Sequence, residues 1–329
     1  MDVAIVGATG LVGQVIFEIL DKSKIKIDNI YAVASERSVG QSIKFKRADI
    51  KIISIENVLQ NKIDVAIFSA GKEVSLKWAP IFVKEGIYVI DNSSAWRMDV
   101  TKKLIVPEIN GHILQKEDKI IPNPNCSTIQ MVMAIHNIHR KYNILRIIVS
   151  TYQSISGTGR KAIAQLDGEE NNTNTEKVYP HQIYKNAIPH CDEFEENGYT
   201  KEEMKLVKET NKILGSNISI TATAVRLPIS GGHSESINIT LEKSFDIDDI
   251  KKIIQNSEGV ILEDKPFENH YPMPLNSQGK DDVYVGRVRR DNSCENSLNM
   301  WVVCDNLRKG AATNTIQIMQ LLTEKGFID

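Results

Sequence analysis

Residues 2–20 read DVAIVGATGLVGQVIFEIL. A short apolar run leads into a loop with three glycines, Gly7, Gly10 and Gly13, and apolar residues then recur at helical spacing. This order predicts a strand, a tight turn and a helix, where the glycines let a pyrophosphate approach the backbone N–H groups at the helix start. The GxxGxxG spacing is related to the dinucleotide-binding fingerprint GxGxxG without being identical to it. The alternative interpretation is a purely structural turn.

The first 125 residues alternate between strand-like and helix-like segments. Buried-strand patterns recur at 30–34, 64–69 and 88–90, and helix-length segments separate them. This alternation predicts an α/β domain of Rossmann-like form with a mostly parallel sheet. Ligands bind such sheets at the carboxyl ends of the strands, which is where Gly71 and Arg97 fall.

The end of the second predicted strand bears on the choice of cofactor. A binder of NAD usually has an acidic residue there, which holds the ribose hydroxyls. Here Arg37 lies between Ser35 and Ser38 and suits a 2′-phosphate, which favours NADP. Glu36 keeps NAD open as an alternative.

The second half of the chain predicts a different kind of sheet. Strand patterns follow one another with few helices between them, at 145–150, 218–227, 234–241, 283–289 and 298–303. This order predicts an α+β domain with a mixed, largely antiparallel sheet, one face of which is free to pack on a partner subunit. A polar segment without periodicity, 168–198, is interpreted as a long excursion that forms an interface arm or a lid.

A single cysteine stands at a chemically special position. Residues 120–128 read IIPNPNCST, and an apolar-periodic segment follows at 129–142. The spacing places Cys126 at or next to a helix N-terminus, where unpaired N–H groups and the helix dipole favour a thiolate. The same N–H groups suit an oxyanion formed when sulfur attacks a carbonyl. The alternative is a buried structural cysteine beside an ordinary capped helix.

Composition narrows the class of protein. A chain of 329 residues favours two domains. The formal net charge of −2 gives no electrostatic reason to expect nucleic acid or an anionic membrane as a partner. No apolar run approaches the ~20 residues that span a bilayer, and the N-terminus lacks the basic region of a signal peptide. The four cysteines form no CxxC pair, so we expect no metal and a reducing, cytoplasmic location.

Eight segments, in order along essentially the whole chain, resemble the aspartate-semialdehyde dehydrogenase family. They are GATGLVG at 7–13, SERSVG at 35–40, SSAWR at 93–97, NPNCST at 123–128, QSISGTG at 153–159, EEMK at 202–205, RLPISGGHSES at 226–236 and DNLRKGAA at 305–312. The related N-acetyl-glutamyl-phosphate reductases typically carry a Pro-Gly-Cys-Tyr turn at the nucleophile. The Pro-Asn-Cys-Ser turn of this chain favours the aspartate family.

The resemblance implies an activity. It implies NADPH-dependent reductive dephosphorylation of L-aspartyl-4-phosphate to L-aspartate 4-semialdehyde through a thioester on Cys126, as part of lysine (diaminopimelate), threonine and methionine biosynthesis. His233 matches the general acid/base, and Gln153 matches the residue that orients the acyl carbon. The alternative is a related acyl-phosphate or acyl-CoA reductase. A silent paralogue or a dinucleotide sensor is disfavoured because the cysteine, the histidine and the arginines are all present.

The resemblance also implies binding residues and an assembly. Arg97 and Lys205 would hold the phosphate, Arg226 the α-carboxylate and Glu202 the ammonium group, with Asn125 as a further substrate contact. The implied cofactor residues are Gly7, Thr9, Gly10, Leu11, Val12, Gly13, Ser35, Arg37, Ser38, Gly71, Ser156, Gly157 and Asn306. A dinucleotide-binding domain, 1–125 completed by a C-terminal helix at 306–329, and a catalytic and dimerisation domain, 126–305, are expected in a homodimer.

Overall fold

The chain folds into two compact units. The computed structural model describes residues 1–328. The N-terminal unit contains residues 1–125 together with the chain from Ala311 onwards, and the central unit contains Cys126–Gly310. Each unit has its own sheet, so each is described separately.

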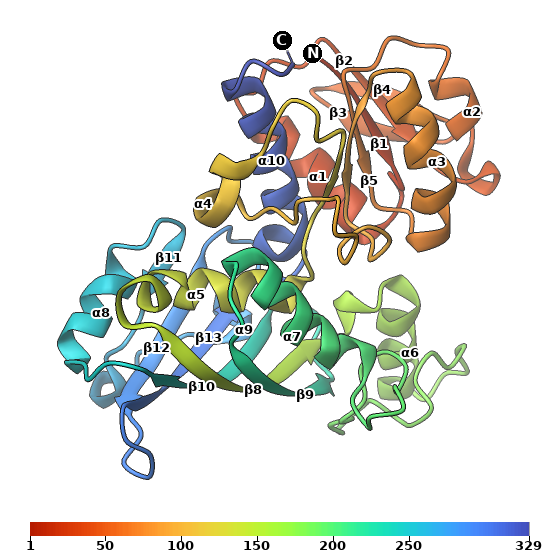
Figure 1. The fold of residues 1–329 in the computed structure, drawn as a ribbon. Coiled ribbons are helices and arrows are strands. Elements are labelled where there is room, and N and C mark those ends of the chain that lie inside the picture. The colour runs from red at the N-terminus through yellow and green to blue at the C-terminus, as the bar shows by residue number, and fades with distance from the viewer. Residues whose placement is uncertain (329) are drawn as a thin grey trace. The chain divides into compact units, whose positions relative to one another are not determined.

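The N-terminal unit is built on a seven-stranded sheet with the order β3-β4-β2-β1-β5-β6-β7 (Figure 1). Its strands are β1 (Asp2–Val6), β2 (Asn29–Val33), β3 (Ser42–Phe45), β4 (Ala48–Ile53), β5 (Val65–Phe68), β6 (Tyr88–Asp91) and β7 (Ile120–Pro122). All neighbouring strands pair in parallel except β3 and β4, which form an antiparallel pair. The helices are α1 (Leu11–Lys22), α2 (Ile55–Val58), α3 (Lys72–Lys84), α4 (Pro107–Asn110) and α10 (Thr313–Glu324). This confirms the predicted Rossmann-like domain.

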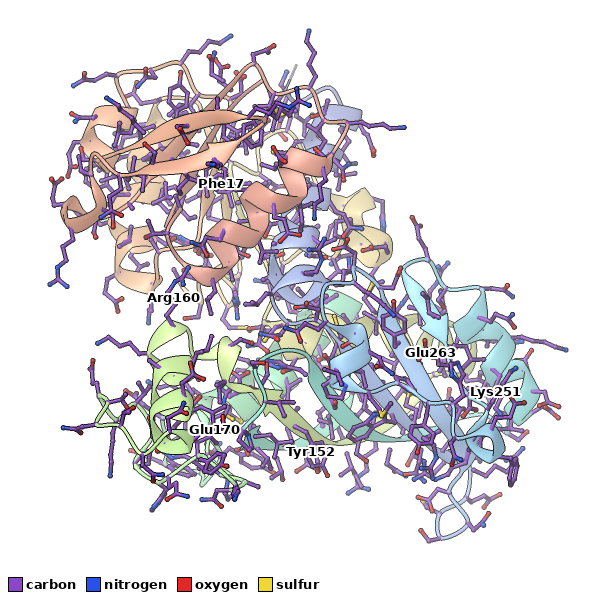
Figure 2. The ribbon with its side chains drawn as sticks, turned by 180° about the vertical axis from the view of Figure 1, so that it is seen from behind. Phe17, Tyr152, Arg160, Glu170, Lys251 and Glu263 are labelled. Carbon is purple, nitrogen blue, oxygen red and sulfur yellow. The ribbon has the colours of Figure 1, made fainter. Side chains whose placement is uncertain are left out.

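The ends of the chain share one hydrophobic core. Ile16 and Phe17 of α1 are buried in the same cluster as Ile316 and Met319 of α10, and Phe17 is labelled in Figure 2. Burial of such side chains contributes roughly 1.5–3 kcal/mol each. The C-terminal helix is therefore an integral part of the N-terminal unit.

The central unit contains a six-stranded mixed sheet with the order β11-β12-β13-β10-β8-β9 (Figure 1). Its strands are β8 (Ile144–Ser154), β9 (Ser219–Leu227), β10 (His233–Leu241), β11 (Val260–Leu262), β12 (Val283–Arg290) and β13 (Ser297–Cys304). The β11–β12 and β8–β9 pairs are parallel, and the other three pairs are antiparallel. The helices are α5 (Cys126–Tyr142), α6 (Arg160–Glu170), α7 (Lys201–Leu214), α8 (Ile247–Gln255) and α9 (Pro274–Ser277). The predicted mixed, largely antiparallel sheet is confirmed.

The two faces of this sheet differ. Helices α5, α7 and α8 lie over one face, toward which alternate residues such as Ile237 and Ile239 of β10 are buried (Figure 1). The opposite face carries Tyr152 of β8 and Trp301 of β13, whose rings lie 5.4 Å apart; Tyr152 is labelled in Figure 2. The catalytic candidates on this sheet lie on the helix-covered face.

Two predicted segments have different bounds in the structure. Helix α6 continues to Glu170, so the first three residues of the segment 168–198, expected to be an excursion, are helical. Gly168 does not break this helix: a Cβ at that position would lie 2.4 Å from Thr175 Cγ2, so the glycine allows the following segment to pack closely. The C-terminal helix, expected over 306–329, begins with a π-helical turn at Arg308–Ala312 that leads into α10.

Candidate active site

The glycine loop forms a backbone cradle at the start of α1. Gly7 has φ +95°, and a Cβ there would lie 2.3 Å from the carbonyl oxygen of Ser69. A Cβ at Gly13 would lie 2.3 Å from the carbonyl oxygen of Gly7, so α1 approaches the loop as closely as the backbone permits. Gly10, at the N-cap, has no side chain that could cap the first turn. This geometry fits a dinucleotide pyrophosphate.

The other predicted cofactor residues of this unit lie at neighbouring strand ends. Strands β2, β1 and β5 are adjacent, and their carboxyl ends lead to Ser35, the glycine loop and Gly71 respectively. Arg37 is exposed within the short 3-10 turn Glu36–Ser38. Thr9, Leu11 and Val12 belong to the glycine loop and the first turn of α1, and Gly71 caps α3 with φ +92°.

Arg97 is held in a polar loop that follows β6. Its Nη2 donates to the carbonyl oxygen of Asn92 at 2.8 Å, and the side chain is largely buried. Burial raises the pKa of nearby Asp91, whose carboxylate accepts hydrogen bonds from the backbone N–H and the hydroxyl of Ser93. Thr315 of α10 donates to Asn92 Oδ1 at 2.8 Å, which ties this loop to the C-terminal helix.

Cys126 is the first residue of α5 and is partly exposed. The helix therefore starts three residues before the periodic pattern, and the predicted place of the cysteine at a helix start is correct. Gly310 lies against it: a Cβ at Gly310 would come within 2.9 Å of Cys126 Cβ. A glycine at this position leaves room beside the sulfur. Asn125, which precedes the helix, is buried.

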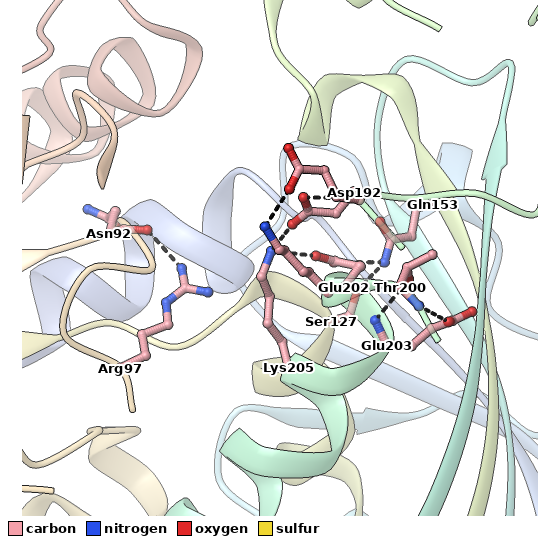
Figure 3. Close-up of polar contacts among 11 residues, drawn as sticks. Asn92, Arg97, Ser127, Gln153, Asp192, Thr200, Glu202, Glu203 and Lys205 are labelled. Atoms are coloured by element: carbon pink, nitrogen blue, oxygen red, sulfur yellow. Dashed lines mark hydrogen bonds and ion pairs between the residues drawn. The ribbon is translucent and has the colours of Figure 1, made fainter. Parts of the chain in front are cut away.

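Gln153 is fixed by two side chains of the central unit (Figure 3). Its Nε2 donates to Ser127 Oγ at 2.8 Å and to Glu202 Oε1 at 3.1 Å. Ser127 follows the cysteine on α5, and Gln153 lies near the end of β8. These bonds connect α5, which begins at Cys126, with the sheet and α7.

The start of α7 is anchored so that two of its residues face the site. Thr200 and Glu203 form a capping box, in which Glu203 Oε2 accepts from the backbone N–H of Thr200 at 2.6 Å. Glu203 Oε1 also accepts from the backbone N–H of Ala224 at 2.8 Å, which attaches the helix to β9. Glu202 and Lys205, three residues apart, therefore share one helix face.

A partly buried ion pair lies on this helix face. Lys205 Nζ is 3.0 Å from Glu202 Oε2 and 2.8 Å from Asp192 Oδ2 (Figure 3). Although burial acts to raise it, the pKa of Glu202 is lowered to about 2 by Lys205 and Arg226. Although burial acts to lower it, the pKa of Lys205 is raised by the carboxylates of Glu202 and Asp192. The site therefore holds an ionised carboxylate that is paired with the Lys205 ammonium and stabilised electrostatically by the Arg226 guanidinium.

The side chains of Arg226 and His233 both lie beside Gly157. A Cβ at Gly157 would lie 3.1 Å from Arg226 Nη1 and 3.2 Å from His233 Nε2, so the glycine leaves space in front of both groups. Arg226 Nη1 donates to the carbonyl oxygen of Ser154 at 2.7 Å. The Nε atom of Arg226 and the Nε2 atom of His233 are both buried, and neither has a hydrogen-bond partner within residues 1–328. Both groups are therefore available to a substrate.

The hydrogen bonds of His233 assign its tautomer. The backbone N–H of Ser154 donates to Nδ1 at 3.1 Å, and a backbone N–H can only donate. Nδ1 is therefore unprotonated, and the neutral ring carries its proton on Nε2. Burial and the Arg226 guanidinium lower the pKa of His233 to about 3, so the ring is neutral at physiological pH. Asn306 stabilises this arrangement, since its Oδ1 accepts from Ser154 Oγ at 3.0 Å and from Ser156 Oγ at 3.2 Å.

Two other histidines, His136 and His139 of α5, make hydrogen bonds to backbone groups of the central unit. Nδ1 of His136 lies 3.1 Å from the carbonyl oxygen of Met133, and Nδ1 of His139 accepts from the backbone N–H of Ile144 at 3.0 Å. Residues 1–328 contain no group of three or more His, Cys, Asp or Glu side chains arranged to hold a metal ion. Among the helices of this part of the chain, none has the length and apolarity that a bilayer crossing requires.

Sequence reasoning missed several residues that build the site. Ser127, Ser154 and Asp192 were not assigned a role, yet they contact Gln153, His233 and Lys205 respectively. The capping box also escaped notice, although the pattern Thr-x-x-Glu at 200–203 is a recognisable signal for a helix start. No local pattern marks Ser154 or Asp192, because their partners are distant in sequence.

Two protein-family models match most of the chain. The model of the semialdehyde dehydrogenase NAD binding domain matches residues 2–117, and the model of the semialdehyde dehydrogenase dimerisation domain matches residues 135–309. The chain is thus a semialdehyde dehydrogenase with a nicotinamide-dinucleotide-binding domain.

Individual relatives define the family more closely. The chain is 48% identical to the aspartate-semialdehyde dehydrogenase of Aquifex aeolicus, over 99% of both chains, and 42% identical to that of Bacillus subtilis, over 100% of this chain and 99% of the relative. It superimposes with a TM-score of 0.94 on the crystal structure of aspartate semialdehyde dehydrogenase II from Vibrio cholerae in complex with ASA, at 40% identity and 98% coverage of both chains. The chain belongs to the aspartate-semialdehyde dehydrogenase family.

Proposed function

We propose that the protein reduces L-aspartyl-4-phosphate to L-aspartate 4-semialdehyde with release of phosphate. The observation that carries this proposal is the ionised Glu202 carboxylate, which pairs with Lys205 and is stabilised electrostatically by Arg226. A substrate with an ammonium group, an α-carboxylate and a phosphate is complementary to one anion and two cations. Arg226 would bind the α-carboxylate, Glu202 the ammonium group and Lys205 the phosphate, with Arg97 and Asn125 as further substrate ligands from the N-terminal unit.

The covalent step would begin at Cys126. Its sulfur attacks the acyl carbon, and the carbonyl π electrons move to oxygen as the C–S bond forms. The helix N-terminus favours both the thiolate and the oxyanion. When the oxyanion collapses, the C–O bond to phosphate breaks and its electron pair leaves with phosphate, so that an acyl thioester remains. Gln153, fixed by Ser127 and Glu202, would orient the acyl group.

The role of His233 follows from its tautomer. With its proton on Nε2, the neutral ring can donate a hydrogen bond to the oxygen of the tetrahedral species, and it has no lone pair at Nε2 with which to accept a proton. When bound, the nicotinamide cofactor supplies the hydride that converts the thioester carbon to the thiohemiacetal level. His233 would then stabilise the negatively charged oxygen of the thiohemiacetal until the C–S bond breaks and the aldehyde leaves.

NADP is the cofactor that we propose on the basis of Arg37, with Glu36 as the feature that would favour NAD. Replacing Arg37 by alanine is expected to weaken NADP binding by about 10- to 100-fold, because a charge-assisted hydrogen bond contributes about 1.5–3 kcal/mol. The dissociation constant of NAD should not change. Fluorescence titration of both cofactors measures this, with the exposed Arg47→Ala as a control. Equal losses for NADP and NAD would refute a contact between Arg37 and the 2′-phosphate.

We also infer a cytoplasmic homodimer. The name of the matching dimerisation domain and the open sheet face that carries Tyr152 and Trp301 support the dimer. The four cysteines at 126, 191, 294 and 304 are free thiols, which supports a reducing compartment.

The rival substrate is N-acetyl-glutamyl phosphate, or another acyl phosphate or acyl-CoA. An N-acetylated substrate carries no ammonium group and would leave the Glu202 carboxylate without its ligand, so the aspartyl substrate is favoured. The test is NADPH formation from L-aspartate 4-semialdehyde and NADP with and without inorganic phosphate. We expect turnover only with phosphate. Turnover with N-acetyl-glutamate semialdehyde, and none with the aspartate compound, would overturn the proposal.

A further inference from the structure

Asp192 reaches the site from the long segment between α6 and α7. Residues 171–200 contain neither helix nor strand, but they are attached to β9 and α7. Ile188 exchanges two backbone hydrogen bonds with Arg226, at 2.7 and 3.0 Å, and Lys201 N–H donates to the carbonyl oxygen of Glu193 at 2.8 Å. Asp192 is thus placed by backbone bonds on both sides of it. The excursion predicted from the sequence contributes a side chain to the substrate site.

Two carboxylates compete for the Lys205 ammonium group. Asp192 Oδ2 lies at 2.8 Å and Glu202 Oε2 at 3.0 Å from Nζ, so one positive charge faces two negative ones. Despite partial burial, the Lys205 ammonium lowers the pKa of Asp192, so the group is anionic at physiological pH. An ammonium has three donors, and these two carboxylates occupy two of them. An arriving phosphate therefore meets a cation that is already neutralised.

The two carboxylates differ in how readily they can leave. The Glu202 side chain is 9% exposed and also accepts from Gln153, whereas the Asp192 side chain is 36% exposed. An exposed aspartate can exchange a lysine for water at lower cost than a buried glutamate can. Asp192 Oδ1 also accepts from the backbone N–H of Glu193 at 2.9 Å, so it is Oδ2 that exchanges Lys205 for water. The backbone bonds of Ile188 and Lys201, which hold the segment, do not involve the carboxylate, so the segment stays in place.

We propose that Asp192 is a competing anion that the substrate phosphate displaces from Lys205, so that Asp192 sets the affinity for phosphate and promotes its release. This inference rests on the proposed function, in which Lys205 binds the phosphate. Return of the carboxylate to Lys205 as phosphate leaves keeps the cation paired at every stage. Asp192 is thus a positioning and charge-balancing residue, and it takes no part in bond making.

The variant Asp192→Asn removes the charge and keeps an oxygen that can accept from Lys205. We expect the dissociation constant of inorganic phosphate, measured by calorimetry on the full chain with NADP bound, to fall by about three- to tenfold. The KM for phosphate should fall by the same factor in the oxidative direction, while the KM for the semialdehyde stays unchanged. A purely structural role would not produce this selective tightening. The difference in phosphate affinity between Asp192→Asn and the unmodified protein should shrink at high salt, because the Lys205–Asp192 pair is partly exposed.

Two control variants separate this inference from the proposed function. Glu193→Gln removes the neighbouring carboxylate, whose partner is the exposed Lys201, and should leave phosphate affinity unchanged. Lys205→Met should abolish phosphate saturation. If Lys205→Met does so but Asp192→Asn binds phosphate equally or more weakly, the role of Asp192 is refuted and the proposed function stands. If Lys205→Met leaves phosphate binding intact, the phosphate assignment on which both depend is wrong.

Discussion

Replacement of Cys126 by alanine is expected to lower kcat by at least about 10⁴-fold, because it removes the nucleophile of the proposed covalent step. NADP binding should persist, since the glycine cradle belongs to the N-terminal unit and contains no part of the cysteine helix. Stopped-flow formation of NADPH measures the chemical step, and tryptophan quenching by NADP measures binding.

The matched control for this change is Cys294→Ala. Cys294 is an exposed free thiol, so its loss should leave kcat unchanged. Turnover by the Cys126→Ala protein at a rate near that of the unmodified protein would exclude a covalent mechanism. Loss of activity in both variants would indicate a general sensitivity of the fold to thiol replacement.

The second large effect is expected at His233. Replacement by alanine removes the Nε2–H donor and should lower kcat by about 10²–10³, the usual loss for one oxyanion donor. His112, exposed in the N-terminal unit, provides the control replacement and should have no effect. An increase in KM alone, with kcat unchanged, would contradict a role in stabilising the reacting oxygen.

The pH behaviour of His233 provides an independent test of its tautomer. Because its pKa lies at about 3, the ring should stay neutral between about pH 5 and pH 9. ¹⁵N NMR of histidine-labelled protein should show a protonated Nε2 and an unprotonated Nδ1 throughout, with the signals identified by their loss in His233→Ala. As pH falls below about 6.5, the unfolded chain binds a proton there that the folded chain does not, so this group lowers the free energy of unfolding until about pH 3. A titration of the ring near neutral pH would contradict the assignment.

Local patterns were sufficient to predict the elements that carry most of the site. The strand, glycine turn and helix at the N-terminus follow from spacing. Helix α7 has a local signal at each end, because a capping box starts it and Gly215, with φ +60°, ends it. Cys126 was predicted at a helix start because two prolines precede it and an apolar periodic segment follows. In each case the sequence signal is local, and so is the structure that it specifies.

Contacts between distant segments could not be predicted in this way. Asp192 lies in a segment without periodicity, and its place depends on bonds between Ile188 and Arg226, which are 38 residues apart in sequence. Strand β11 has only three residues, and its identity depends on pairing with β12. The proton of His233 is assigned only by the backbone of Ser154, which belongs to another strand. These features depend on tertiary structure and leave no local pattern.

The central claim is a covalent acyl group on Cys126. The most direct measurement mixes the full-length protein with L-aspartate 4-semialdehyde and NADP in phosphate-free buffer, quenches in acid and analyses the peptides by mass spectrometry. We expect an aspartyl group on the peptide that contains Cys126, released by hydroxylamine and lost when phosphate is added before the quench. A full equivalent of NADPH formed while Cys126 remains unmodified would contradict the thioester mechanism.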